Sequence, residues 1–106
     1  MPSPEFQIQI PGDRMADFCR RWKISQLEAF GSVLRDDFRP DSDVDLLVTF
    51  GADADWHWRD YLRMEDELRE ILGREVDLVR RDLVEASPNY IRRRHILRSA
   101  RPLYVA

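Results

Sequence analysis

A short apolar run headed by two aspartates constrains this chain more than any other feature. Residues 44–50, VDLLVTF, have the β-branched and aromatic content of a buried strand and are too few for a helix. Alternate side chains of a strand share a face, so Asp43 and Asp45 are expected side by side, about 6 to 7 Å apart. Like charges beside an apolar strand favour a cation between them, and hard oxygen ligands suit Mg²⁺. The run therefore favours a metal-phosphate site.

A glycine-serine pair upstream adds the features of a phosphate site. The apolar residues before it predict a short strand that ends at Gly31, where glycine permits a sharp turn or the close approach of a ligand. Ser32 is expected in the first turn of a short helix over residues 32–36, whose free amides would hold phosphate oxygens. Arg35, one turn later, is a weaker candidate for a cationic contact. We expect Gly31, Ser32 and Arg35 to bind phosphates beside the carboxylates.

The spacing of these residues resembles a known motif. Gly-Ser, ten residues and then Asp-x-Asp is similar to the defining motif of the DNA polymerase β-type nucleotidyltransferase superfamily. Residues 30–48 resemble the smallest branch of this superfamily, the minimal nucleotidyltransferases (MNT, MntA-like), in their sequence FGSVLRDDFRPDSDVDLLV. Members of that branch are often antitoxin partners of HEPN-domain toxins. The resemblance covers residues 10–104. It implies an α+β fold, in which helices pack on a small mixed sheet with a polymerase β-like core.

The same resemblance implies a chemistry and a third carboxylate. The nucleotide would be ATP, two Mg²⁺ ions would assist, and AMP would pass to a hydroxyl, such as a tyrosine of a partner HEPN toxin. Residues 75–79, EVDLV, form a second strand-like run that places Asp77 between two apolar residues. Asp77 fits the family's third acidic position, which helps to hold the metal and accepts the proton of the attacking hydroxyl. Asp43, Asp45 and Asp77 are thus the expected catalytic and metal-binding residues.

Other functions remain open at this point. The chain could be a non-catalytic antitoxin that covers the active site of its partner. A superfamily member that modifies antibiotics or tRNA could share the motif, but such enzymes usually carry extra domains for the acceptor. An ordinary turn cap would account for Asp41 or Asp43, but not for Asp45 or Asp77 within apolar strands.

The remaining pattern predicts one domain over residues 1–106 with an extended arm over residues 1–11. A helix capped by Asp13 should run to Trp22 and place Cys19 in the core. A long helix is predicted over residues 56–72, with Gly73 ending it. A helical turn over residues 82–86 precedes a last helix, expected from Ser87-Pro88 to about residue 99, and residues 102–105 form an edge strand.

Composition sets broad limits. The 106 residues are 43% hydrophobic and 35% charged, which is typical of a soluble globular domain. The sequence contains neither an apolar run of about 20 residues nor a signal-peptide pattern, so a cytoplasmic location is expected and no membrane association. The net charge of −3 gives no chain-wide case for binding nucleic acid, and direct binding of nucleic acid is not expected.

Two features have more than one interpretation. The tryptophans of Trp56-His57-Trp58 could pack the start of a helix, stack on a base or contact a partner. The last helix is basic, and it is either a solvated face or a surface for an acidic partner or RNA phosphates. Its cationic candidates are Arg92, Arg93, Arg94, His95, Arg98 and Arg101.

Overall fold

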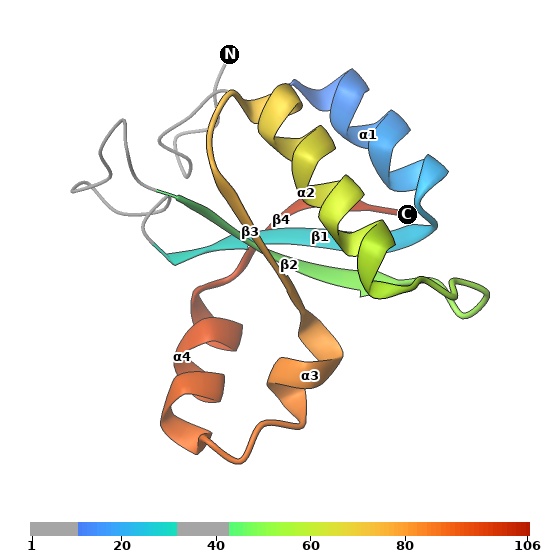
Figure 1. Cartoon of the computed structure of the whole chain (residues 1–106). Coiled ribbons are helices and arrows are strands. Elements are labelled where there is room, and N and C mark those ends of the chain that lie inside the picture. The colour runs from blue at the N-terminus through green and yellow to red at the C-terminus, as the bar shows by residue number, and fades with distance from the viewer. Residues whose placement is uncertain (1–10, 32–42) are drawn as a thin grey trace.

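The computed structural model describes residues 11–31 and 43–106 as a four-stranded sheet with helices on both faces (Figure 1). Helices α1 and α2 cover one face, and helices α3 and α4 lie against the other. The elements, in chain order, are α1 (Gly12–Arg21), β1 (Ile24–Phe30), β2 (Val44–Phe50), α2 (Trp58–Leu72), β3 (Val76–Arg80), α3 (Arg81–Glu85), α4 (Tyr90–Ser99) and β4 (Arg101–Val105).

The sheet is mixed, and β2 is one of its two central strands. The strand order is β3-β2-β1-β4, in which β2 is antiparallel to β1 and parallel to β3, while β4 is antiparallel to β1. A parallel pair needs a crossover connection, and α2 supplies it between β2 and β3. The predicted α+β class with a small mixed sheet is confirmed, as is the position of the last strand at an edge.

Alternation along the strands divides the buried side chains between the two faces. The larger core lies under α1 and α2 and includes Leu27, Ala29, Val44, Leu46 and Val48 from the sheet, joined by Met15, Phe18, Cys19, Met64 and Leu68 from the two helices. Cys19 is completely buried, as predicted. The opposite face has a smaller cluster made by Phe30, Leu47, Val84 and Ile96. The two faces of one sheet are thus closed to different extents.

Helix α1 begins earlier than its predicted cap. The carbonyl of Pro11 already accepts the amide of Met15 at 3.0 Å, so the helical ladder starts at Gly12. Asp13 is therefore in the first turn rather than at the cap, and the prediction that it caps the helix is wrong. Its carboxylate still lies where the positive end of the helix dipole favours an anion.

Helices α2 and α4 each begin two residues later than predicted, because a local cap fixes each start. At α2, His57 is the N-cap and its amide donates to the carboxylate of Asp60 at 2.9 Å. At α4, the side chain of Asn89 accepts the amide of Arg92 at 3.1 Å, which leaves Ser87 and Pro88 before the helix. Gly73 ends α2 in the left-handed region at φ 68°, as predicted.

The predicted arm over residues 1–11 falls almost entirely outside the described residues, and the short helix over residues 32–36 falls wholly outside them. Within residues 11–31 and 43–106, no helix is both long and apolar enough to cross a bilayer.

Candidate active site

Asp45 and Asp77 occupy paired positions on neighbouring parallel strands. In the register of β2 and β3, Asp45 is the direct partner of Asp77, and the pairs Val44–Val76 and Leu46–Leu78 flank it. Partners in a parallel ladder lie about 4.8 Å apart and project to the same face. Two carboxylates separated by 31 intervening residues in the sequence are therefore adjacent in the fold.

Gly31 lies directly against the carboxylate of Asp45. At the end of β1, Phe30 is the strand partner of Asp45, and Gly31 follows in the left-handed region at φ 75°. A Cβ atom placed on Gly31 would lie only 2.6 Å from Oδ2 of Asp45, which is closer than real Cβ atoms come. Glycine is thus needed here for its backbone conformation and for the space that the carboxylate takes. The first residue of the predicted phosphate site and the second predicted acid are neighbours.

Asp43 precedes this pair at the start of β2. The amide of Val44 donates to the carbonyl of Glu75 at 2.9 Å, which extends the pairing of β2 and β3 to the start of both strands, next to Asp43. The side chains of Asp43 and Asp77 are exposed, whereas Asp45 is half-buried. The three predicted acids thus occupy one end of two adjacent strands, with access from solvent.

The donor set at this end is chemically suited to Mg²⁺, because three carboxylates supply hard oxygen ligands. Among the described residues, however, no group of three or more His, Cys, Asp or Glu side chains is gathered closely enough to hold a metal ion. The backbone register fits such a site, while the side chains do not form a closed cage. Ser32 and Arg35, the other two predicted phosphate ligands, lie outside the described residues.

A partly buried ion pair beside the site was not predicted from the sequence. Glu28 is only 5% exposed in β1, and its carboxylate accepts a hydrogen bond from Arg81 at the start of α3. This bond raises the pKa of the Arg81 guanidinium. Glu28 lies two residues before Phe30 on the same face, so Arg81 joins α3 to the sheet near the acids. A lone glutamate within the apolar run LEAF was the available signal.

The tryptophan segment lies at the other end of β2, where Trp56 packs against Trp22. The indole N–H of Trp56 donates to the carbonyl of Trp22 at 2.9 Å, and the two rings meet edge to face with centroids 5.0 Å apart. His57 caps α2, while Trp58 remains 66% exposed beside Arg59, whose guanidinium carbon lies 5.5 Å from the ring centre. The packing interpretation is confirmed for Trp56, and a partner or base contact of Trp58 stays a prediction.

Comparisons with known proteins agree with this architecture. The model of the nucleotidyltransferase domain family matches residues 15–101. A candidate protein adenylyltransferase of Methanocaldococcus jannaschii, MJ0435, is 38% identical over 56 residues, which are 53% of this chain. That match spans 58% of the length of the relative, so the chain corresponds to little more than half of it.

Solved structures give the same fold. A candidate minimal nucleotidyltransferase superposes with a TM-score of 0.64 at 32% identity, over 86% of this chain and 87% of the other. A toxin-antitoxin complex with AMP-PNP gives 0.67 at 18% identity, over 92% and 75% of the two chains. The complex of an MNT antitoxin with a tri-AMPylated HEPN toxin of Shewanella oneidensis gives 0.59 at 20% identity, over 90% and 70%.

The match to the family therefore rests on most of the chain and includes every element that carries the acids. With the α+β fold, the paired carboxylates and the Gly-Ser spacing in agreement, the chain belongs to the nucleotidyltransferase domain family.

Proposed function

We propose that this chain transfers AMP from ATP to a hydroxyl group of a partner protein, a tyrosine of a HEPN toxin, and thereby acts as its antitoxin. The observation that carries the proposal is the pairing of Asp45 with Asp77 on parallel strands, with Gly31 packed against Asp45. The relatives named above support a proposal of AMP transfer to a partner protein. One is a candidate protein adenylyltransferase, and one structural neighbour is bound to an AMPylated HEPN toxin.

In the proposed reaction, each group has one task. The acceptor oxygen attacks the α-phosphorus, the bond from that phosphorus to the bridging oxygen breaks, and pyrophosphate leaves. Asp77 accepts the proton of the acceptor hydroxyl, a role that its exposed position permits. Gly31, Ser32 and Arg35 hold the β- and γ-phosphates, which orients the α-phosphorus toward the acceptor.

The carboxylates have a second task, because the triphosphate is itself an anion. Asp43 and Asp45 would hold two Mg²⁺ ions, one of them shared with Asp77. Bound Mg²⁺ supplies charge neutralisation to the phosphates and makes the acceptor hydroxyl easier to deprotonate. Without a cation, the three acids would repel the nucleotide, so we expect transfer to stop when divalent ions are removed with a chelator.

The test uses purified protein, ATP labelled on its α-phosphate, Mg²⁺ and a candidate HEPN partner protein. Label should move to the partner with the wild-type protein and not with the Asp43→Ala/Asp45→Ala variant. Asp53→Ala/Asp55→Ala is a matched control, because it removes an Asp-x-Asp pair just beyond the other end of β2. That control should label the partner normally.

A second function is favoured by one observation. Helix α4 exposes Tyr90 and Ile91, which suits a non-catalytic antitoxin that blocks its partner by contact. The same experiment separates the two functions. A folded, partner-bound protein that transfers no label, with neutralisation unchanged in the Asp43→Ala/Asp45→Ala variant, would exclude the enzymatic proposal and leave the binding function.

A further inference from the structure

Charge is distributed very unevenly along this chain. All 20 acidic residues lie within the first 88 residues, together with 12 of the 17 basic ones. Residues 89–106 contain five arginines and no aspartate or glutamate. The segment formed by α4 and β4 is therefore strongly positive, although it belongs to a protein whose remaining part is negative. An uneven distribution of this kind affects which partners approach, and on which side.

The arginines of this segment are not used in ion pairs within the described part of the chain. Arg93 donates to the carbonyl of Ser87 at 3.0 Å, Arg94 to the hydroxyl of Tyr90 at 3.4 Å, and Arg101 to the carbonyl of Ala100 at 3.1 Å. By contrast, arginines of the preceding helices and of β3 pair with carboxylates; these are Arg21, Arg69, Arg80 and Arg81. The positive charge of α4 is thus available to another molecule.

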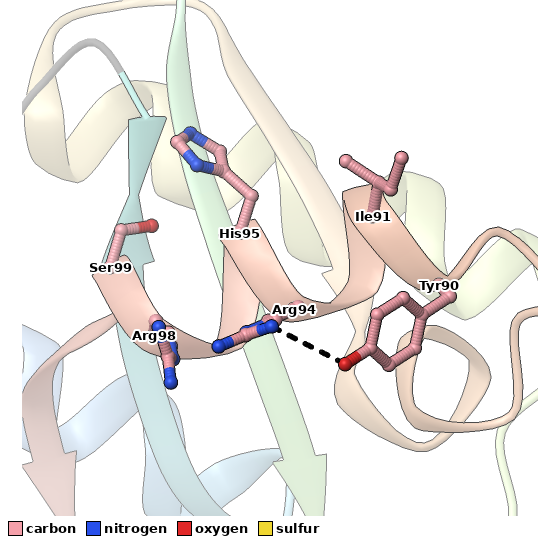
Figure 2. A pocket seen from close by; sticks show the side chains of 6 residues that line it. All are labelled: Tyr90, Ile91, Arg94, His95, Arg98 and Ser99. Carbon is pink, nitrogen blue, oxygen red and sulfur yellow. Dashed lines mark hydrogen bonds between the residues drawn. The ribbon is translucent and has the colours of Figure 1, made fainter.

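The outward side chains of α4 combine this charge with exposed apolar surface. Tyr90, Ile91, Arg94, His95, Arg98 and Ser99 surround a shallow hollow of about 510 Å³, and we call this surface the α4 outer face (Figure 2). Ile91 is 80% exposed and Tyr90 is 57% exposed. Helical spacing places Tyr90, Arg94 and Arg98 in one row and Ile91, His95 and Ser99 in the next.

The α4 outer face lies on the same side of the sheet as the carboxylates. The inward side of α4 packs Ile96 against Phe30 and Leu47. Phe30 is the strand partner of Asp45, and Leu47 is two residues along from it. A molecule held on the α4 outer face would therefore extend over the side of the sheet from which Asp45 and Asp77 project.

We propose that the α4 outer face docks an acidic surface of the acceptor protein and so presents the acceptor hydroxyl to the site; this rests on the proposed function. Guanidinium groups bind carboxylates in a two-pronged geometry, which suits Arg94 and Arg98. Tyr90 and Ile91 supply the apolar contact, and tyrosine and arginine are enriched among residues that dominate binding energy. The stripe from Tyr90 to Arg98 is about 12 Å long, enough for roughly two turns of a partner helix.

Charge favours a protein over RNA as the occupant. An RNA strand carries its negative charge along its whole length, and the acidic first 88 residues of this chain would repel the parts that extend beyond α4. A protein with a local acidic patch meets only the positive segment. One face of the Tyr90 ring is also already covered by Arg93, whose guanidinium carbon lies 5.4 Å from the ring centre, which leaves less surface for stacking bases.

The test measures binding of the HEPN partner to the full chain and, separately, transfer of labelled AMP. Arg94→Glu/Arg98→Glu should weaken binding by at least about tenfold, because like charges then face each other. It should also raise the KM for the partner while kcat at saturating partner is kept. Arg20→Glu/Arg63→Glu is the matched control, since it reverses two exposed arginines on α1 and α2, and it should change binding less than about twofold.

Ile91→Ser is a second variant that tests the apolar part without changing charge. Because Ile91 is 80% exposed, folding should be unaffected while partner binding weakens. A labelled 20-nucleotide RNA serves as the competing probe. Binding of this RNA that is tighter than binding of the partner, and that is lost in Arg94→Glu/Arg98→Glu, would overturn the proposal.

The outcomes also separate this proposal from the proposed function. Partner binding that depends on Arg94 and Arg98 without any transfer of label would retain the docking surface and exclude the reaction. Transfer and binding that are both unaffected by the Arg94→Glu/Arg98→Glu variant would retain the reaction and overturn the docking surface. A wild-type chain that does not bind the partner would overturn the docking proposal outright.

Discussion

The two faces of the sheet differ in what they do with the same strands. Under α1 and α2, the inward side chains are apolar and fully enclosed. Under α3 and α4, the cover is smaller, and the same strands place Asp45, Asp77 and the buried Glu28 among a few apolar residues. The adjacent residues Asp45 and Leu46 belong to opposite faces. A single strand of a small protein can thus serve the core with one set of residues and chemistry with the other.

The difference implies that activity and stability can be changed separately. Substitutions that alternate along β2 should affect one property and then the other. The predictions below test this separation, from the largest expected effect to the smallest.

Asp45→Asn should abolish most of the activity and leave the fold intact. The substitution removes one negative charge from the carboxylates that would hold Mg²⁺. Because a metal ion on the phosphates stabilises the transition state by several kcal/mol, AMP transfer should fall by about 10³-fold. Thermal unfolding should stay close to that of the wild type, because the residue lies outside the main core. A melting temperature lowered as much as that of a core variant would contradict the division between the faces.

Leu46→Ala should have the opposite effect. Leu46 is completely buried, and removing its side chain leaves a cavity under α1 and α2, which should lower the free energy of unfolding by about 3 kcal/mol. Urea unfolding measures this change, and activity per folded molecule should be retained. Leu62→Ala, at a position that is 52% exposed on α2, is the control and should shift stability by about 0.5 kcal/mol or less.

Gly31→Ala should affect both properties, because Gly31 adjoins the site and needs a special backbone. The methyl group would be strained at φ 75° and would press on Asp45, so we expect a loss of about 1 to 2 kcal/mol in unfolding free energy together with reduced activity. Gly73→Ala has a similar strain at φ 68° but meets no atom within 4 Å. If both variants reduce activity equally, the contact with Asp45 is unimportant.

The free energy of unfolding should depend on pH through the buried thiol of Cys19. Burial raises the pKa of its thiol from 9.0 to about 12, so the folded protein keeps the thiol protonated where the unfolded chain ionises. Stability should therefore fall as the pH rises above 9, by about 1 kcal/mol at pH 10 relative to pH 8. Urea unfolding under reducing conditions checks this, and Cys19→Ala should lack that part of the pH dependence.

Sequence patterns predicted the elements of this chain well because they are local. The apolar run of β2, the glycine that ends α2 and the buried Cys19 each depend on a few neighbouring residues, and each is confirmed. The starts of α2 and α4 were misplaced because His57 and Asn89 cap them through specific hydrogen bonds, and composition does not reveal which residue does so.

The candidate site was harder to predict because it depends on pairing between distant strands. The motif spacing predicted Asp43 and Asp45 as site residues, and the family resemblance predicted Asp77; these roles stay predictions. Neither pattern predicted that Asp45 and Asp77 are direct strand partners, since the register depends on how α2 connects β2 to β3. The burial of Glu28 against Arg81 likewise depends on where α3 meets the sheet. The assignments of Ser32 and Arg35 stay predictions.

The position of β3 at the edge of the sheet has a consequence for how the site could be switched off. Among the strands of the described residues, β3, which carries Asp77, has a neighbour on one side, whereas β2, which carries Asp45, is paired on both sides. Local opening costs least where backbone pairing is least, so we expect β3 to open more readily than β2, at the cost of exposing Val76 from the larger core. Separation of β3 from β2 would then divide the carboxylate pair, while the pairing of β1 with β2 and β4 does not depend on β3.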